Sequence, residues 1–150
     1  MTKILFICHG NICRSPMAEF ILKRLVKKSD KIGCFDTFEI SSAAVSREEI
    51  GNDIYPPAKQ VLSAKGVPFT YHAARQMTQA DYDYYDYIIC MDRSNLSWLR
   101  YICEDTEHKV SLLMQWAGKD CDVADPWYTG DFETAYKDIL EGCQALLDTI

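Results

Sequence analysis

Residues 3–16 of the chain read KILFICHGNICRSP. Residues 3–7 are a short, largely apolar run, which is typical of a strand buried in a parallel sheet. Pro16 suits the first turn of a helix, and the apolar residues that follow recur at helical spacing: Ala18, Ile21, Leu22, Leu25 and Val26. The segment therefore predicts a strand, a tight loop and a helix in immediate succession.

The loop of residues 8–15 has the composition of an anion site. A turn from a strand into a helix points backbone N–H groups inward, and the helix start adds a positive dipole end, so the loop attracts a dianion. The same environment, together with Arg14, favours the thiolate form of Cys8, which is the nucleophilic form. The planar guanidinium of Arg14 can hold two phosphoryl oxygens at once. The loop therefore predicts a phosphate site with its own nucleophile.

The other loop residues are expected to shape this site. Gly10 and Asn11 are residue types that tolerate a positive φ, which so tight a loop demands. Ser15 is expected to cap the helix or to donate to the Cys8 thiolate. The competing interpretation treats the cysteines as buried packing residues and Arg14 as a surface charge. The expected phosphate-binding residues are His9, Gly10, Asn11, Ile12, Cys13, Arg14 and Ser15.

The loop resembles the Cys-x-Gly-Asn-x-Cys-Arg-Ser-Pro loop of the low-molecular-weight protein tyrosine phosphatases. The similarity covers nearly the whole chain, through Ser41–Ala44, Gly66–Pro68, His72–Gln76, Met91–Leu96 and Asp125–Tyr128. It implies one α/β domain over residues 1–150, with a central four-stranded parallel sheet in the order 2-1-3-4, helices on both faces and the phosphate-binding loop after the first strand. It also implies a metal-independent hydrolase that cleaves phosphotyrosine esters through a phosphocysteine, without a cofactor.

Composition narrows the possible classes. The chain has 150 residues, is 48% hydrophobic and shows no linker or repeat, which fits one domain with a substantial core. Seven cysteines, an odd number, without a signal-like segment indicate a reducing cytoplasm. A net charge of −6 argues against nucleic-acid or anionic-membrane partners. We expect a monomer that acts on a phosphotyrosine protein, with inorganic phosphate as product and inhibitor.

Hydrophobic periodicity predicts alternating strands and helices. Strands are expected at residues 3–8, 38–42, 87–91 and 109–113, and helices at 16–28, 57–65, 94–102 and 131–149, with a short one at 78–82. Ligands of such parallel sheets bind beyond the carboxyl ends of the strands. Cys8 is therefore expected to lie near Ser42, Met91 and the segment after Leu113.

A second catalytic group is needed because an alkoxide or aryl oxide leaves a phosphate ester poorly unless it is protonated. Pro126 restrains the preceding Asp125 to an extended conformation, which would hold its carboxyl group over the loop. Taken alone, Asp-Pro more often starts a turn. The family resemblance implies instead that Asp125 is the general acid, and then the general base for water.

The resemblance also assigns supporting residues. His72 would hydrogen-bond Asn11, with Ser15 and Ser42 completing the support of the loop. Cys13 is expected either to pack under the loop or to form a protective disulfide with Cys8 on oxidation. Zinc binding by Cys8, Cys13, His9 and His72 was weighed and not favoured, because the spacing offers no second ligand pair. The remaining cysteines are expected to be packing residues: Cys34, Cys90, Cys103, Cys121 and Cys143.

The substrate slot departs from the family pattern. Glu48 stands where an aromatic residue often forms one wall, and Trp127 and Tyr128 follow Asp125-Pro126 where two tyrosines are more usual. Trp127 could stack on a phenyl ring. We expect the carboxylates of Glu48, Glu49 and Asp53 to bias the mouth against acidic phosphopeptides.

Three alternative activities remain open at this point. Arsenate reduction would need a cysteine relay, for which Cys90 is available but Ser97 stands where the next thiol is required. A phosphoarginine phosphatase resembles this pattern with Thr at the position of Ile12, so Ile12 favours phosphotyrosine. A cysteine phosphocarrier would retain the phosphoryl group, and it has no need of Arg14 and Asp125.

Overall fold

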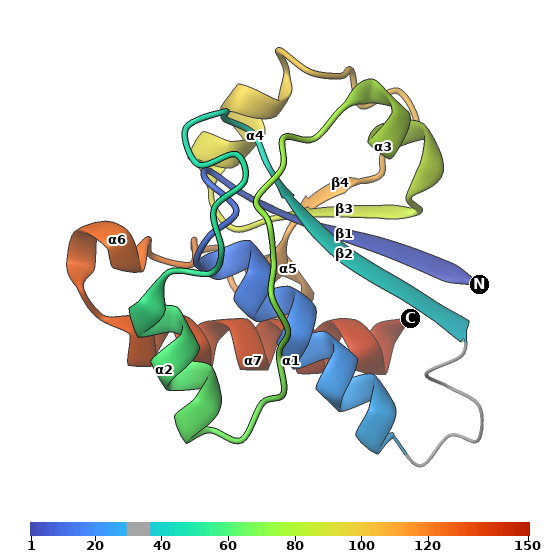
Figure 1. Ribbon diagram of the computed structural model, residues 1–150. Coiled ribbons are helices and arrows are strands. Elements are labelled where there is room, and N and C mark those ends of the chain that lie inside the picture. The colour runs from blue at the N-terminus through green and yellow to red at the C-terminus, as the bar shows by residue number, and fades with distance from the viewer. Residues whose placement is uncertain (30–36) are drawn as a thin grey trace.

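The computed structural model describes residues 1–29 and 37–150, which fold around one parallel sheet. The strands are β1 (Thr2–Cys8), β2 (Phe38–Ala44), β3 (Tyr87–Cys90) and β4 (Val110–Leu112). All three pairings are parallel, and the strand order is β2-β1-β3-β4. The predicted fold class and strand order are therefore confirmed (Figure 1).

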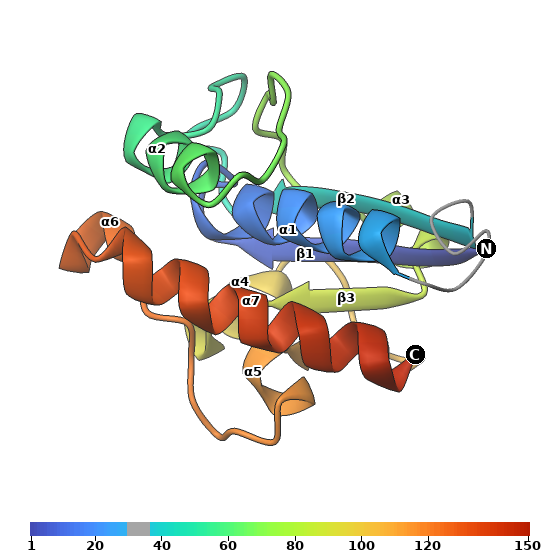
Figure 2. The same cartoon turned by 90° about the horizontal axis from the view of Figure 1, so that it is seen from below.

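Helices cover both faces of the sheet. The helices are α1 (Arg14–Lys28), α2 (Pro56–Ala64), α3 (Gln79–Tyr84), α4 (Arg93–Leu99), α5 (Leu113–Trp116), α6 (Pro126–Thr129) and α7 (Phe132–Thr149). Figure 2 shows α1 and α7 in front of the strands, whereas α3 and α4 lie on the opposite face. Among the described residues, no helix is both long and apolar enough to cross a membrane.

Two hydrophobic clusters hold these layers together, and β1 contributes to both. Ile4 and Phe6 are buried with residues of α1 and α7, whereas Leu5 and Ile7 are buried in the cluster that includes Tyr82 and Leu99. Successive side chains of a strand point to opposite faces, so a strand covered on both sides is apolar throughout. This explains the continuous apolar run of residues 4–7.

The structure corrects several predicted boundaries. α1 begins at Arg14 rather than Pro16, so the loop closes earlier than the proline suggests. The helix predicted for residues 94–102 ends at Leu99, because the next two turns are closed by the shorter bonds from Tyr101 N–H to the Trp98 carbonyl and from Ile102 N–H to the Leu99 carbonyl. α5 and α6 were not predicted, since a helix of one turn has no periodic pattern.

The sheet order places the end of β1 at a topological switch point. β1 lies between β2 and β3, so the connections after β1 and after β3 run to opposite sides, which opens a crevice at the carboxyl ends of these strands. Cys8 is the last residue of β1 and pairs in register with Ala44, the last residue of β2. The fold therefore puts the cysteine of the loop in the crevice where ligands bind.

Gly142 of α7 gives a test of the packing beneath the sheet. A Cβ at this position would lie 2.5 Å from Cγ of Leu113 in α5. Although alanine is favoured over glycine by about 1 kcal/mol in a helix interior, overpacking costs about 1–3 kcal/mol. We expect Gly142→Ala to lower the free energy of unfolding in urea by about 1 kcal/mol on balance. Gln144→Ala, on the exposed side of α7, should change it by less than about 0.5 kcal/mol, and a Gly142→Ala protein more stable than wild type would contradict the packing.

Candidate active site

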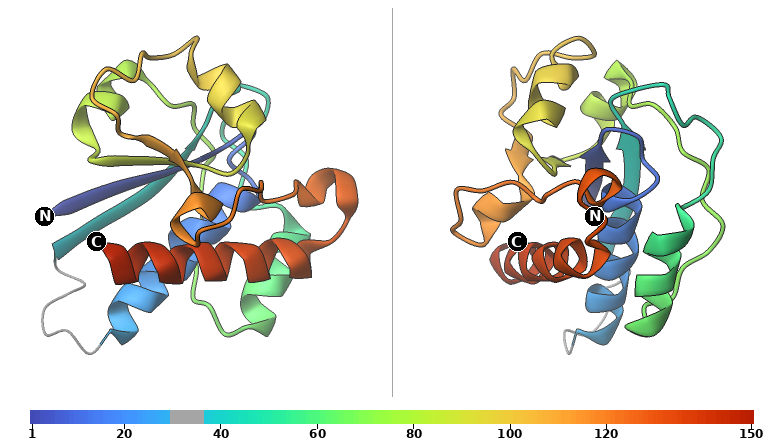
Figure 3. Two further views of the ribbon diagram at one scale, coloured as in Figure 1. Left: turned by 180° about the vertical axis from the view of Figure 1, so that it is seen from behind. Right: turned by 90° about the vertical axis from the view of Figure 1, so that its left-hand side faces the viewer.

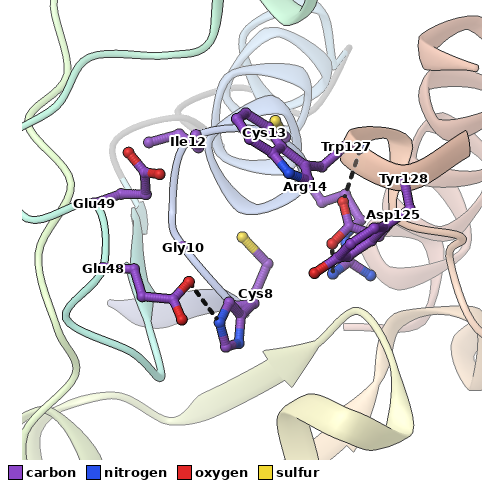
Figure 4. A pocket seen from close by; sticks show the side chains of 11 residues that line it. Cys8, Gly10, Ile12, Cys13, Arg14, Glu48, Glu49, Asp125, Trp127 and Tyr128 are labelled. Carbon is purple, nitrogen blue, oxygen red and sulfur yellow. Dashed lines mark hydrogen bonds and ion pairs between the residues drawn. The ribbon is translucent and has the colours of Figure 1, made fainter. Parts of the chain in front are cut away.

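A small cavity opens at the carboxyl end of β1. Its walls come from the loop after β1, the segment after β2, and the segment that leads into and forms α6 (Figures 3 and 4). The lining residues are Cys8, His9, Gly10, Ile12, Cys13, Arg14, Glu48, Glu49, Asp125, Trp127 and Tyr128. Residues that are far apart in the sequence therefore meet at one site.

The sulfur of Cys8 lies in a polar environment although the residue is only 3% exposed. Its Sγ is 3.0 Å from the Ser15 hydroxyl oxygen. It also accepts a hydrogen bond of 3.3 Å from the backbone N–H of Asn11. Cys8 precedes α1 in the chain, so the positive end of that helix faces the loop. These donors stabilise a negative charge on the sulfur.

Asn11 fixes the shape of the loop. Its φ is +61°, a left-handed conformation that asparagine tolerates better than most residues. Its Nδ2 donates to the hydroxyl oxygens of Ser15, at 2.8 Å, and Ser42, at 3.0 Å. Gly10 has no positive φ, so the expectation of one was wrong; its lack of a side chain matters because a Cβ there would come within 3.2 Å of Cγ of Glu49.

The carbonyl side of Asn11 is held equally well. Its Oδ1 is 2.9 Å from Nε2 of His72 and accepts a 3.2 Å hydrogen bond from the backbone N–H of Arg75. The Ser42 hydroxyl in turn donates to Oε1 of Glu19 at 2.7 Å. The expected contact between His72 and the loop is present, and the network extends further than the sequence indicated, to Glu19 and Arg75.

Arg14 is 2% exposed and is surrounded by acceptors. Its Nη1 donates at 2.7 Å to both Oδ2 of Asp92 and the carbonyl oxygen of Val123. Its Nη2 lies 3.3 Å from Oδ2 of Asp125. Burial opposes the charged form, but the neighbouring Cys8, Asp92 and Asp125 outweigh it and raise the pKa of the guanidinium. Arg14 is therefore a fixed positive charge at the floor of the cavity.

Asp125 lies directly before α6. Its φ of −76° and ψ of 110° are the extended values that a following proline favours. Oδ1 accepts a 3.0 Å hydrogen bond from the Trp127 backbone N–H and so caps α6, while Oδ2 faces Arg14. Both interpretations of Asp-Pro apply at once, since the residue starts a helix and also lines the cavity.

The mouth of the cavity carries charged and aromatic side chains. Glu48 Oε2 is 3.0 Å from Nε2 of His9 (Figure 4). The ring of Trp127 packs against Tyr55, with centroids 4.8 Å apart, whereas Tyr128 is 84% exposed. Asp53 does not line the cavity: its carboxylate binds Lys59 and the backbone N–H of His72. The expectation that Asp53 contributes charge to the mouth is therefore wrong.

The cysteines divide into one polar and several apolar environments. Burial raises the pKa of the Cys13 thiol, which the neighbouring Cys8 raises further, so Cys13 is a neutral thiol at physiological pH. Cys90, Cys103 and Cys143 are buried as expected, but Cys121 is exposed, and Cys34 lies outside the described residues. The described part of the chain contains no group of three or more His, Cys, Asp or Glu residues arranged to hold a metal ion.

Comparison with known proteins identifies this arrangement. The model of the family described as low molecular weight phosphotyrosine protein phosphatase matches residues 3–150. The chain belongs to this family. It is 39% identical to the low molecular weight protein-tyrosine-phosphatase YfkJ of Bacillus subtilis, covering 100% of this chain and 96% of the relative. It is 36% identical to the human low molecular weight phosphotyrosine protein phosphatase, covering 97% of this chain and 93% of the relative.

Solved structures agree with the sequence comparison. The crystal structure of YfkJ superposes with a TM-score of 0.92 at 38% identity, covering 100% of this chain and 94% of that chain. The crystal structure of a Drosophila arginine phosphatase gives a TM-score of 0.86 at 32% identity, covering 99% of this chain and 97% of that chain. The fold is therefore shared by proteins whose names report different phosphorylated substrates.

Sequence reasoning missed one charged partner in this phosphatase, Asp92. It follows β3, at the same edge of the sheet as Cys8, and its Oδ1 accepts the Asn95 N–H as the N-cap of α4. An aspartate directly after a buried strand and before a helix is a detectable signal. Its second contact, with Arg14, joins residues 78 positions apart and is visible only in three dimensions.

Proposed function

We propose that this protein tyrosine phosphatase hydrolyses phosphotyrosine esters through a phosphocysteine on Cys8, and that residues 1–150 act as one catalytic domain. The observation that carries the proposal is the convergence of three groups on one cavity: the Cys8 sulfur, the Arg14 guanidinium and the Asp125 carboxyl. They are the nucleophile, the anion-binding group and the acid that the reaction requires.

The first step transfers the phosphoryl group to sulfur. The Cys8 thiolate attacks phosphorus, an S–P bond forms, the P–O bond to the tyrosine breaks, and Asp125 gives its proton to the departing oxygen. Backbone N–H groups of residues 9–15 and the Nη2 side of Arg14 bind the phosphoryl oxygens. Asp92 and the Val123 carbonyl hold the Nη1 side, which supports a fixed orientation of the guanidinium.

The second step releases phosphate. Asp125, now a carboxylate, accepts a proton from a water molecule, whose oxygen attacks phosphorus as the S–P bond breaks. Cys8 leaves as a thiolate, and the Ser15 hydroxyl and the Asn11 N–H are placed to stabilise it. Inorganic phosphate is then the product, and the same donors make it a competitive inhibitor. The protein is proposed to work as a cytoplasmic monomer.

The alternatives have less support. Cys90 is fully buried in β3 and burial raises its pKa, which makes it a poor member of a thiol relay for arsenate reduction. A phosphocarrier would not need an acid beside its cysteine, yet Asp125 lines the cavity. Ile12 also lines it, and its apolar side chain suits a phenyl ring better than the guanidinium of phosphoarginine.

The proposed acid role of Asp125 predicts a dependence on the leaving group. We expect Asp125→Ala to lower kcat about 100-fold or more for an unactivated aryl phosphate, and far less for one with an acidic phenol, because general-acid catalysis is worth about 10²–10⁴-fold. Asp148→Asn, on the exposed side of α7, is the matched control. Wild-type activity should peak below neutral pH, since Asp125 must be protonated while Cys8 is ionised. A rate that rises steadily to alkaline pH would refute this role.

The acidic mouth predicts a charge preference. Glu48 and Glu49 line the cavity, so acidic residues on both sides of the phosphotyrosine should be repelled. We expect kcat/KM to be lower for such a peptide than for its basic counterpart, and the Glu48→Gln, Glu49→Gln double variant to reduce the difference. Raising the salt concentration should also reduce it. An equal or stronger preference for the acidic peptide would contradict this assignment.

We also propose that Cys13 protects Cys8 from irreversible oxidation. Peroxide would convert the Cys8 thiolate to a sulfenic acid; the Cys13 sulfur would then form the S–S bond and lose its proton, and water would leave. Both cysteines line the cavity, which supports the pairing. We expect dithiothreitol to restore peroxide-treated wild type but to restore little of the Cys13→Ser protein. Equal recovery of the two proteins would exclude the disulfide.

A further inference from the structure

An exposed groove lies on α4 outside the active-site cavity. It is lined by Ser97, Trp98, Arg100 and Tyr101, which we call the α4 groove. Trp98 is 45% exposed and Tyr101 is 90% exposed. The two rings are three positions apart along a helical turn, so they lie on the same side of the chain. Two aromatic side chains exposed next to one another are typical of a surface that binds a polypeptide.

The groove adjoins the mouth of the active site. Trp98 packs edge-on against His9, with ring centroids 5.3 Å apart, and His9 lines the cavity that contains Cys8. In Figure 1, α4 lies over the loop that follows β1. Because an extended chain advances about 3.3–3.6 Å per residue, a peptide leaving the mouth on this side reaches Trp98 within about two or three residues.

The charges on the two sides of the mouth are opposite. Glu48 and Glu49 form one wall of the cavity. Within residues 1–29 and 37–150, Arg100 at the other side makes no ion pair, whereas Arg93 on the same helix is paired with Asp120 and Asp122. An unpaired guanidinium beside aromatic rings favours a carboxylate partner. A substrate would therefore meet repulsion of acidic residues on one side and attraction on the other.

We propose that the α4 groove binds the polypeptide that flanks the phosphotyrosine of the substrate. The groove takes a large apolar or aromatic residue about two or three positions from the phosphotyrosine, packed on Trp98 and Tyr101, and an acidic residue beyond it that pairs with Arg100. This inference rests on the proposed function, since it assigns part of the substrate of the same site. It makes Trp98, Tyr101 and Arg100 determinants of specificity that lie outside the chemistry.

The test compares a small and a large substrate of the same enzyme. The substrates are 4-nitrophenyl phosphate and phosphotyrosine peptides with a neutral background, in which a Leu-Leu-Glu segment is placed either before or after the phosphotyrosine. We expect wild type to prefer one placement. For that peptide, Trp98→Ala and Arg100→Glu should each lower the ratio of its kcat/KM to that of 4-nitrophenyl phosphate about tenfold, the size of a typical aromatic or arginine contact.

Two control variants match these changes elsewhere on the surface. Tyr84→Ala removes an aromatic side chain that is 46% exposed and contacts Lys3 near the opposite end of the sheet. Lys137→Glu reverses an exposed charge on α7. Both should leave the ratio unchanged. The Arg100→Glu protein should also lose its preference for Glu over Gln in the peptide, an effect that a folding defect would not produce.

The outcomes separate this inference from the proposed function. Failure of wild type to hydrolyse 4-nitrophenyl phosphate would overturn the proposed function itself. Normal hydrolysis, with a ratio that none of the α4 variants changes, would overturn only the α4 groove. Sedimentation of wild type and Trp98→Ala at assay concentration covers the remaining occupant: a wild-type dimer that Trp98→Ala dissociates would assign the groove to a second copy of the chain and overturn the proposal.

Discussion

The buried positive charge of Arg14 is the constraint on which the site depends. A guanidinium that is 2% exposed is costly unless acceptors surround it, and here the acceptors come from β3 and from the segment before α6. Asp92, the Val123 carbonyl and Asp125 are thereby fixed relative to the loop of Cys8. One charge both binds the phosphoryl group and assembles the three segments that act on it.

A second, largely neutral network gives the loop its shape. Asn11, in a left-handed conformation, is bonded on its amide side to Ser15 and Ser42 and on its carbonyl side to His72 and Arg75. Fully satisfied buried networks of this kind specify one geometry. The separation has a consequence for function: Asn11 orients the donors that face the phosphate, while Arg14 and its partners position the acid.

Local features of the sequence predicted much of this structure. The strand, loop and helix of residues 3–28 follow from a continuous apolar run, a proline and helical spacing, and the resemblance supplied the strand order. Other features depend on contacts made at long range. Glu19 reads as one more charge on a helix, yet it accepts from Ser42, and Asp92 reads as a cap, yet it binds Arg14. Asp53 was misplaced because its neighbours Lys59 and His72, rather than its sequence position, decide where its carboxylate points.

The account stands on the covalent role of one sulfur, and the most direct measurement is mass spectrometry of the acid-quenched enzyme during turnover of an aryl phosphate. We predict a phosphoryl group on the peptide that contains Cys8, more abundant in Asp125→Ala if the loss of the base slows hydrolysis of the adduct more than its formation from an activated ester. Cys8→Ala should give neither adduct nor turnover. Absence of the adduct under conditions of steady turnover, or normal activity in Cys8→Ala, would contradict the mechanism.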